Sequence, residues 1–228
     1  MGINIEGLTP LEQEETLKKL LLRKKILELQ KDQKEDFLTF VRSVWPEFIA
    51  GRHHKIIAKK FEAIANKKIK RLIVNMPPRH TKSEFASYLF PAWMMGREPR
   101  LKIIQTSHTA ELAQRFGRKV RNLIDTQDYQ NIFPGMELSA DSKAAGRWET
   151  NQGGEYFSAG VGGAITGRGA DLLIIDDPHS EQDALSATAL ENAWEWYSSG
   201  PRQRLQPGGA IVIVMTRWNT KDITGELK

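Results

Sequence analysis

The chain has 228 residues, of which 40% are hydrophobic and 27% charged, a composition typical of a globular protein with room for a large core. It contains no cysteine, which excludes disulfide bonds and thiolate metal sites. Its formal net charge of +5 and its pI near 9.3 are compatible with a polyanionic partner, although lysines on solvated helix faces give the same total.

The N-terminal region predicts helices. Thr9, Pro10 and Glu12 form a helix-start pattern, with a capping threonine, proline in the first turn and glutamate three positions after the threonine. The basic cluster at residues 18–25 is either a DNA-binding patch or, as we favour, a solvated helix face. The layout of a secretory signal is missing, and no stretch is apolar over a length that would span a bilayer, so we expect a cytosolic protein without membrane contact.

A second helical pattern follows Gly51, with His53 and His54 at its start. Adjacent helical positions do not share a face, so these histidines are not expected to form a metal pair. We divide the chain into an N-terminal helical segment, residues 1–50, and an α/β core, residues 51–228.

Residues 71–83 predict a strand, a tight loop and a helix. The apolar run at residues 72–76 is typical of a buried parallel strand, and Pro77-Pro78 end it because neither proline can donate to a sheet. Lys82 and Ser83 then precede a helical segment. This is the layout of a phosphate-binding loop, in which loop amides face phosphates, the lysine reaches the outer ones and the serine hydroxyl binds Mg²⁺.

The loop departs from the usual pattern G-x-x-x-x-G-K-[ST], because Met76 and Thr81 occupy the two glycine positions. Glycine is common there since its backbone adopts angles that a Cβ penalises. Taken alone, the segment also fits an ordinary strand-to-helix turn with an exposed lysine.

Four more strands are expected, at residues 101–107, 156–158, 170–177 and 210–216, with a long helix near residues 112–124. Strands that alternate with helical segments predict a parallel sheet covered on both faces. I-I-D-D at the end of the 170–177 strand places two carboxylates at the carboxyl edge of the sheet, where ligands bind in such folds. Asp176 is placed to hold Mg²⁺, and Asp177 to orient or deprotonate an attacking water.

The acidic pair also fits a solvated turn, but together with the Lys-Ser loop it favours a nucleotide site. Thr216 ends the last expected strand and is a candidate contact to a γ-phosphate.

Three motifs in this order, Pro77–Ser83, Asp176–His179 and Met215–Trp218, resemble the ATPase domain of tailed-phage large terminase subunits, which pump DNA into procapsids. The resemblance extends from about Phe37 onward. It implies a three-layer P-loop NTPase fold of the additional-strand (ASCE) type, with a mostly parallel central sheet flanked by helices. It also implies ATP hydrolysis with ATP and Mg²⁺ as cofactors, in the host cytoplasm during virion assembly. The implied partners are double-stranded DNA contacted through its backbone, the portal and procapsid, the small terminase subunit and further copies of the chain in a ring.

The resemblance also assigns residues. Nucleotide contacts are expected from Pro78, Arg79, His80, Thr81, Lys82, Ser83 and Thr216, Mg²⁺ contacts from Ser83 and Asp176, and catalytic roles for Asp177, Arg79 and Arg168. Relatives usually carry glutamate at the position of Asp177, so Glu181 is a reserve candidate for the catalytic carboxylate. Arg168 is either an arginine finger acting on a neighbouring subunit or a loop cation between glycines. Residues 45–54 resemble the region that holds adenine.

Two alternatives stay open at this point. One is a helicase-like or recombinase-like ATPase with the same sheet, and the other is a nucleotide-responsive assembly module that does not hydrolyse. Large terminases also carry a C-terminal nuclease domain, and no nuclease activity is expected of this chain.

Overall fold

The computed structural model describes residues 9–165 and 167–228, which are built around a seven-stranded sheet of order β1-β7-β6-β2-β5-β4-β3. The strands are β1 (Arg71–Asn75), β2 (Lys102–Ser107), β3 (Leu138–Ala144), β4 (Arg147–Thr150), β5 (Glu155–Gly160), β6 (Ala170–Asp176) and β7 (Leu205–Met215). Strands β1, β7, β6, β2 and β5 are parallel, whereas β4 and β3 extend the sheet as an antiparallel hairpin.

Strand β7 lies between β1 and β6, with Ile213 paired to Ile73 on one side and to Ile175 on the other. One strand therefore separates the strand that leads into the Lys-Ser loop from the strand that ends in the two acids. This insertion is the additional-strand arrangement, and it confirms the expected fold class. The carboxyl ends of these parallel strands share one edge of the sheet, so the segments that follow them come together there.

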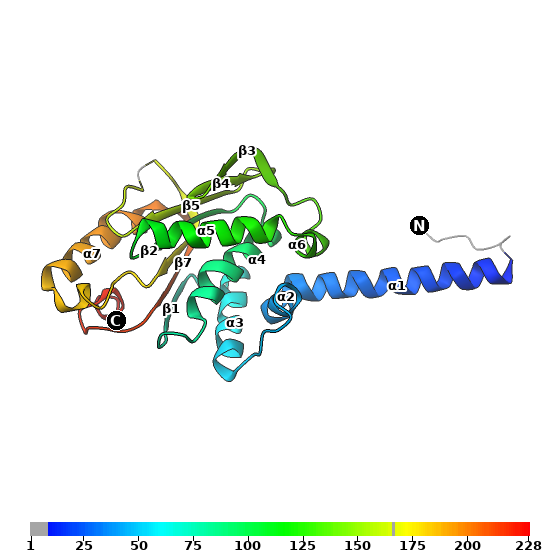
Figure 1. Ribbon diagram of the computed structural model, residues 1–228, viewed down its shortest axis with the longest axis horizontal. Coiled ribbons are helices and arrows are strands. Elements are labelled where there is room, and N and C mark those ends of the chain that lie inside the picture. The colour runs from blue at the N-terminus through cyan, green and yellow to red at the C-terminus, as the bar shows by residue number, and fades with distance from the viewer. Residues whose placement is uncertain (1–8, 166) are drawn as a thin grey trace.

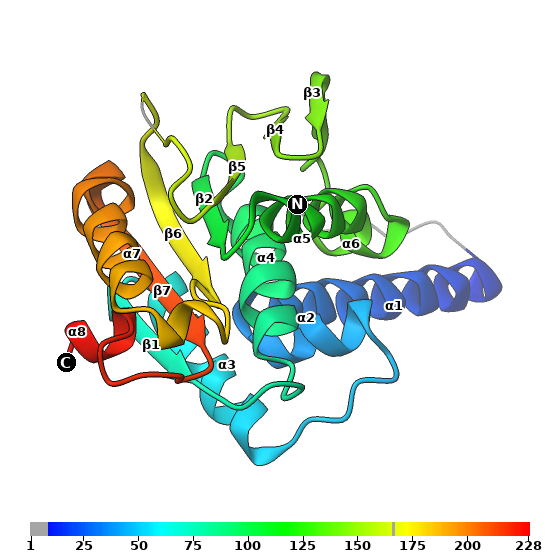
Figure 2. The same ribbon diagram turned by 60° about the vertical axis from the view of Figure 1, so that its left-hand side comes forward.

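Helices cover both faces of the sheet (Figures 1 and 2). They are α1 (Pro10–Glu35), α2 (Phe37–Val44), α3 (Arg52–Ala65), the π-helical turn η1 (Glu84–Leu89), α4 (Phe90–Arg97), α5 (Ala110–Ile124), α6 (Gln127–Ile132), the 3₁₀ turn η2 (Asp183–Leu185), α7 (Ala187–Ser199), the 3₁₀ turn η3 (Pro201–Arg204) and α8 (Ile223–Glu226). Alternate strand residues point to opposite faces. Leu172 and Ile174 thus join the core beneath α2, α3 and α4, whereas Ile175 joins a second core beneath α7.

Helix α1 extends away from the rest of the molecule (Figure 1). The expected capping box is present, because the Thr9 side chain accepts from the amide of Glu12 and the Glu12 carboxylate accepts from the amide of Thr9. Only the end of the helix is anchored, where Gln30 Nε2 donates to the Asn131 carbonyl at 2.6 Å and the Gln33 carbonyl accepts from the Trp93 indole at 2.9 Å.

The division of the chain at residue 50 stays a prediction. Helix α2 packs into the core of the sheet, with Phe37 and Phe40 both 0% exposed. Among the described residues, no helix combines the length and apolar character that crossing a membrane requires.

Candidate active site

The loop between β1 and η1 forms the turn that glycines usually supply. Arg79 (φ 62°) and Thr81 (φ 59°) both adopt left-handed backbone angles. A β-branched residue is rare in this region, because its side chain crowds the backbone. Thr81 thus has the conformation expected of the missing glycine, and its hydroxyl donates to the His80 carbonyl at 2.6 Å. The exposed side chains of Pro78, Arg79 and His80 form the outer surface of this loop.

Lys82 and Asp177 form an ion pair across the site. The Lys82 side chain is only 6% exposed, and its Nζ lies 2.9 Å from Oδ2 of Asp177. An ammonium so far withdrawn from water requires a counter-charge. The other carboxylate oxygen of Asp177, Oδ1, accepts from the Thr216 amide at 2.8 Å. Asp177 therefore links the loop after β1 to the end of β7.

Ser83 and Asp176 meet beside this pair. Ser83 Oγ donates to Asp176 Oδ1 at 2.9 Å, and Ser87 Oγ donates to Asp176 Oδ2 at 2.7 Å. Burial and the neighbouring Asp177 raise the pKa of Asp176 to about 7, against the opposing effects of Ser87, Ser83 and Lys82. Both oxygens of the buried carboxylate are therefore oriented by hydroxyl groups.

Two residues behind Asp176 were missed by sequence reasoning. Ser87 lies on the π-helical turn η1 and is 0% exposed. Its hydroxyl accepts from Gln105 Nε2 at 3.0 Å. Gln105 lies within β2 and is equally buried. Ser87 interrupts an apolar run and Gln105 follows two isoleucines in an expected strand, and these features of the sequence point to them.

The donor set fits Mg²⁺. The Ser83 hydroxyl and the Asp176 carboxylate supply hard oxygen ligands, which Mg²⁺ prefers. In the part of the chain that the structure describes, no group of three or more His, Cys, Asp or Glu side chains could hold a metal ion by itself. Mg²⁺ usually keeps several waters and is bound by one or two protein groups together with substrate phosphates, and Ser83 and Asp176 are two such groups.

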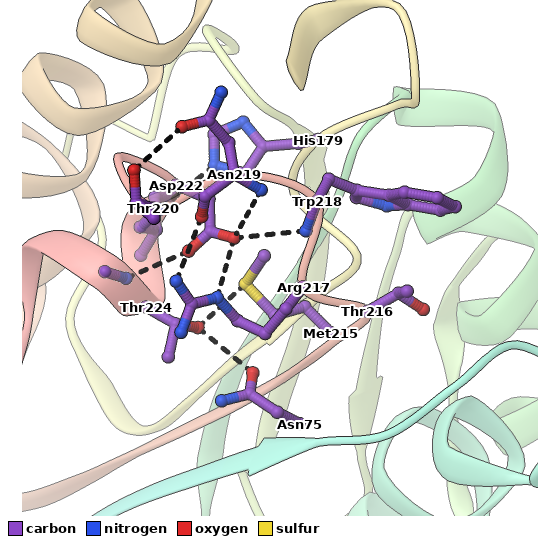
Figure 3. Close-up of polar contacts among 12 residues, drawn as sticks. Asn75, His179, Met215, Thr216, Arg217, Trp218, Asn219, Thr220, Asp222 and Thr224 are labelled. Carbon is purple, nitrogen blue, oxygen red and sulfur yellow. Dashed lines mark hydrogen bonds and ion pairs between the residues drawn. The ribbon is translucent and has the colours of Figure 1, made fainter. Parts of the chain in front are cut away.

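The segment after β7 is held by a buried aspartate (Figure 3). Asp222 is 0% exposed, and its Oδ2 accepts from Arg217 Nε at 2.8 Å and from the amides of Trp218 and Asn219 at 3.3 Å each. Its Oδ1 accepts from the Gly225 amide at 2.9 Å and so caps α8. Sequence reasoning missed Asp222, although an acid just before a short helical stretch is a typical capping pattern.

Thr216 connects this segment to the loop after β1. Its hydroxyl donates to the Met76 carbonyl at 3.2 Å, and its amide contacts Asp177 as described above. Thr216 thus touches both sides of the site through different atoms.

Two predicted residues lie away from this cluster. The Arg168 guanidinium pairs with the Glu155 carboxylate and stacks 4.2 Å from the centre of the Phe157 ring. Arg168 lies just before β6 whereas Asp176 ends it, and the strand between them spans roughly 20 Å at about 3.3 Å per residue. Glu181 is exposed on the turn between β6 and η2. The structure brings neither to Lys82, and the roles assigned to all these residues stay predictions.

No protein-family profile matches the chain. Among curated proteins, it is similar to the large terminase subunit of Enterobacteria phage T3, with 27% identity over 164 residues. That alignment covers 71% of this chain and 28% of the relative, so the chain spans little more than a quarter of the relative's length. The match confirms the resemblance that the three motifs indicate.

A solved structure of the large terminase from the thermophilic bacteriophage D6E, in complex with ATP-gamma-S, is also similar. The TM-score is 0.42 and the identity 13%, and the match covers 69% of this chain and 37% of that one.

Proposed function

We propose that the chain is the ATPase part of a phage DNA-packaging motor of the large terminase class. In this proposal, Mg²⁺-dependent ATP hydrolysis drives double-stranded DNA into a procapsid. The similarity to the phage T3 protein supports the class. The observation that carries the chemistry is the meeting of two segments 93 positions apart in the chain, where Ser83 contacts Asp176 and Lys82 contacts Asp177.

Lys82 is the proposed phosphate-binding cation. A triphosphate in the loop would compete with Asp177 for its ammonium, because phosphate oxygens carry more negative charge than one carboxylate. Lys82 then stabilises the charge that develops on the transferred phosphoryl group. Arg79, on the exposed side of the same loop, would add a second positive charge.

Asp177 is the proposed catalytic carboxylate. Once Lys82 turns to a phosphate, Oδ2 of Asp177 becomes available to accept a hydrogen bond from an attacking water, while Oδ1 stays fixed by the Thr216 amide. Ser83 and Asp176 would hold Mg²⁺, which when bound neutralises charge on the phosphate oxygens.

Thr216 is the proposed start of the coupling to DNA movement. A change in the position of Asp177 would act on the Thr216 amide, and through it on the Arg217–Asn219 segment, which Asp222 holds. The proposed route therefore runs from the hydrolysis site through the end of β7 to α8.

The remaining partners belong to the same proposal. DNA would be contacted through its backbone, since packaging cannot depend on sequence, and its binding should then weaken steeply with salt. The net charge of +5 is compatible with such contacts. The portal and procapsid, the small terminase subunit and further copies of the chain in a ring complete the assembly, which would operate in the host cytoplasm.

Binding of Mg²⁺ and ATPγS, measured by calorimetry, tests the site without requiring a ring. We expect the wild-type chain to bind and Lys82→Ala to bind at least about tenfold more weakly while keeping its circular dichroism spectrum. Equal affinity in the two proteins would refute the loop assignment.

Mg²⁺-dependent phosphate release, measured with and without procapsid and small subunit, then tests hydrolysis. Stimulation by these components supports the packaging motor, whereas separation of DNA strands by the purified chain would favour a helicase.

A further inference from the structure

The Thr81 hydroxyl is contacted by a residue of helix α3. His54, in the first turn of α3, places its Nε2 against the Thr81 hydroxyl. The two residues are 27 positions apart in the chain. The contact therefore joins the phosphate-binding loop to a helix that precedes β1.

The direction of this hydrogen bond follows from the other ring nitrogen. The Gly51 amide donates to His54 Nδ1 at 2.9 Å, so Nδ1 carries the lone pair. Burial and the neighbouring His53 and His80 lower the pKa of His54 to about 4, so its ring is neutral near pH 7. A neutral ring that accepts at Nδ1 carries its hydrogen at Nε2. His54 therefore donates to Thr81 Oγ1, which in turn donates to the His80 carbonyl.

The imidazole is held firmly enough to act as a support. His54 is 7% exposed, and its ring centroid lies 4.8 Å from that of Phe48 and 4.9 Å from that of Phe85. Phe48 precedes the helix and Phe85 follows the loop, so the ring is enclosed from two sides. A donor fixed in this way restrains the hydroxyl that it contacts.

We propose that His54 is a positioning residue that keeps the phosphate-binding loop preformed by holding Thr81 in the left-handed conformation that glycine otherwise supplies. The inference rests on the proposed nucleotide-binding function of this loop. Without the donor, Thr81 relaxes toward negative φ, and the loop amides turn away from the position of the phosphates. The apparent affinity is then the intrinsic affinity multiplied by the fraction of molecules whose loop is competent to bind.

A double-mutant cycle tests this role, with the dissociation constant of Mg²⁺ and ATPγS as the measurement. We expect His54→Ala to weaken binding about tenfold, the effect of losing one buried hydrogen bond. Thr81→Gly supplies the second background of the cycle, because glycine adopts the same backbone angles without support. His54→Ala combined with Thr81→Gly should then bind like Thr81→Gly alone. Equal weakening by His54→Ala in both backgrounds would overturn the proposal.

Two further variants keep the test decisive if His54→Ala does not fold. Thr81→Val removes the hydroxyl but keeps the branched shape, and we expect it to weaken binding as much as His54→Ala does. His54→Gln places an amide donor near the position of Nε2 and should retain most of the affinity. Wild-type affinity in Thr81→Val would contradict the proposed support.

The tautomer of His54 provides a readout that does not depend on nucleotide. Nitrogen-15 NMR of the nucleotide-free chain should show a neutral ring protonated at Nε2, and a ring protonated at Nδ1 would overturn the inference. If neither the wild-type chain nor Thr81→Gly binds ATPγS, the proposed function fails instead, and the two failures are distinguishable.

Discussion

Nζ of Lys82 lies 2.9 Å from Oδ2 of Asp177, so the cation of the loop after β1 and the acid after β6 neutralise each other across the site. The Lys82 side chain is 6% exposed and that of Asp177 31%, and the pair is therefore only partly screened by water. A phosphate that binds Lys82 necessarily removes the partner of Asp177. In our proposal, nucleotide binding and release of the catalytic carboxylate are for this reason one event.

Asp177→Asn should destabilise the nucleotide-free chain by about 1–3 kcal/mol, because the buried Lys82 ammonium loses its ion-pair partner. Saturating Mg²⁺ and ATPγS should reduce this loss, since the phosphates then supply the charge. Urea unfolding with and without nucleotide measures both values. Asp171→Asn makes the same chemical change at the other end of β6, where the side chain accepts from the Lys102 amide at 2.9 Å, and its effect should not depend on nucleotide. A nucleotide-independent loss in Asp177→Asn would argue against exchange of Lys82 between the two anions.

The positions of Asp177 and Glu181 relative to Lys82 distinguish these two candidates for the catalytic carboxylate. Asp177 lies against Lys82 and Thr216, whereas Glu181 is exposed four residues further on. We expect Asp177→Asn to lower kcat about 10²–10⁴-fold, the usual contribution of a general base, without weakening nucleotide binding, because the substitution removes the anion that competes with the phosphates for Lys82. Glu181→Gln should keep kcat within about twofold of wild type. A large loss of kcat in Glu181→Gln alone would transfer the role to Glu181.

Arg168 cannot reach the site of its own chain, because it lies at the opposite edge of the sheet from Asp176. If it acts on a neighbouring subunit, Arg168→Ala should lower turnover only in assembled motors. A mixture of Arg168→Ala with Lys82→Ala should then regain part of the activity, because each subunit supplies what the other lacks. Arg147→Ala serves as the control, since Arg147 Nε contacts the same Glu155 at 3.4 Å. No recovery in the mixture, or an equal loss in Arg147→Ala, would favour a loop cation without a catalytic role.

Much of the fold was predictable because buried parallel strands are continuous apolar runs. The segments that became β1, β2, β5, β6 and β7 were all expected, and the sheet is parallel where they pair. The expected burial of β1 was wrong, because β1 lies at the edge of the sheet and its residues alternate between exposed and half-buried. The β3–β4 hairpin was missed, since Leu138–Ala144 is largely polar and lies at the sheet edge. Strand β7 begins at Leu205, five residues before the expected start. Its first residues were not expected to be strand, because they include Pro207 and two glycines and lack an apolar run.

The site was predictable only where chain order sets its geometry. Residues that follow the carboxyl ends of parallel strands must share an edge, so the convergence of Lys82, Ser83, Asp176 and Asp177 could be expected. The contacts of Ser87 and His54 could not. Ser87 reaches Asp176 from a π-helical turn, and His54 reaches Thr81 from a separate helix. Both depend on how the helices pack, which local sequence does not encode.

The lowered pKa of His54 predicts a pH effect on stability. Burial, His53 and His80 lower this pKa from 6.5 to about 4. Between these two pH values, His54 is protonated in the unfolded chain and neutral in the folded chain. Stability should therefore fall as the pH drops from 6.5 toward 4. His54→Gln should reduce this fall by about 1–3 kcal/mol, whereas His179, whose pKa is also lowered by burial, affects both proteins alike. Urea unfolding across this pH range measures the difference, and parallel curves for the two proteins would show that His54 is not buried in its neutral form.

The part of α1 before Gln30 should be dispensable for the stability of the rest of the molecule. Leu17, Leu22 and Leu27 are 57%, 60% and 56% exposed, and the anchoring contacts begin only at Gln30. Deleting residues 1–26 removes little buried apolar surface, so the unfolding midpoint should change by no more than about 2 °C.

Deleting residues 1–36 also removes Gln33, whose carbonyl binds the fully buried Trp93 and whose side chain donates to Ser43 at 2.8 Å. This longer deletion should lower the midpoint clearly, because it leaves the Trp93 indole without its acceptor. A comparable loss from the shorter deletion would mean that the exposed leucines are covered in solution, and analytical ultracentrifugation would then show whether a second copy covers them.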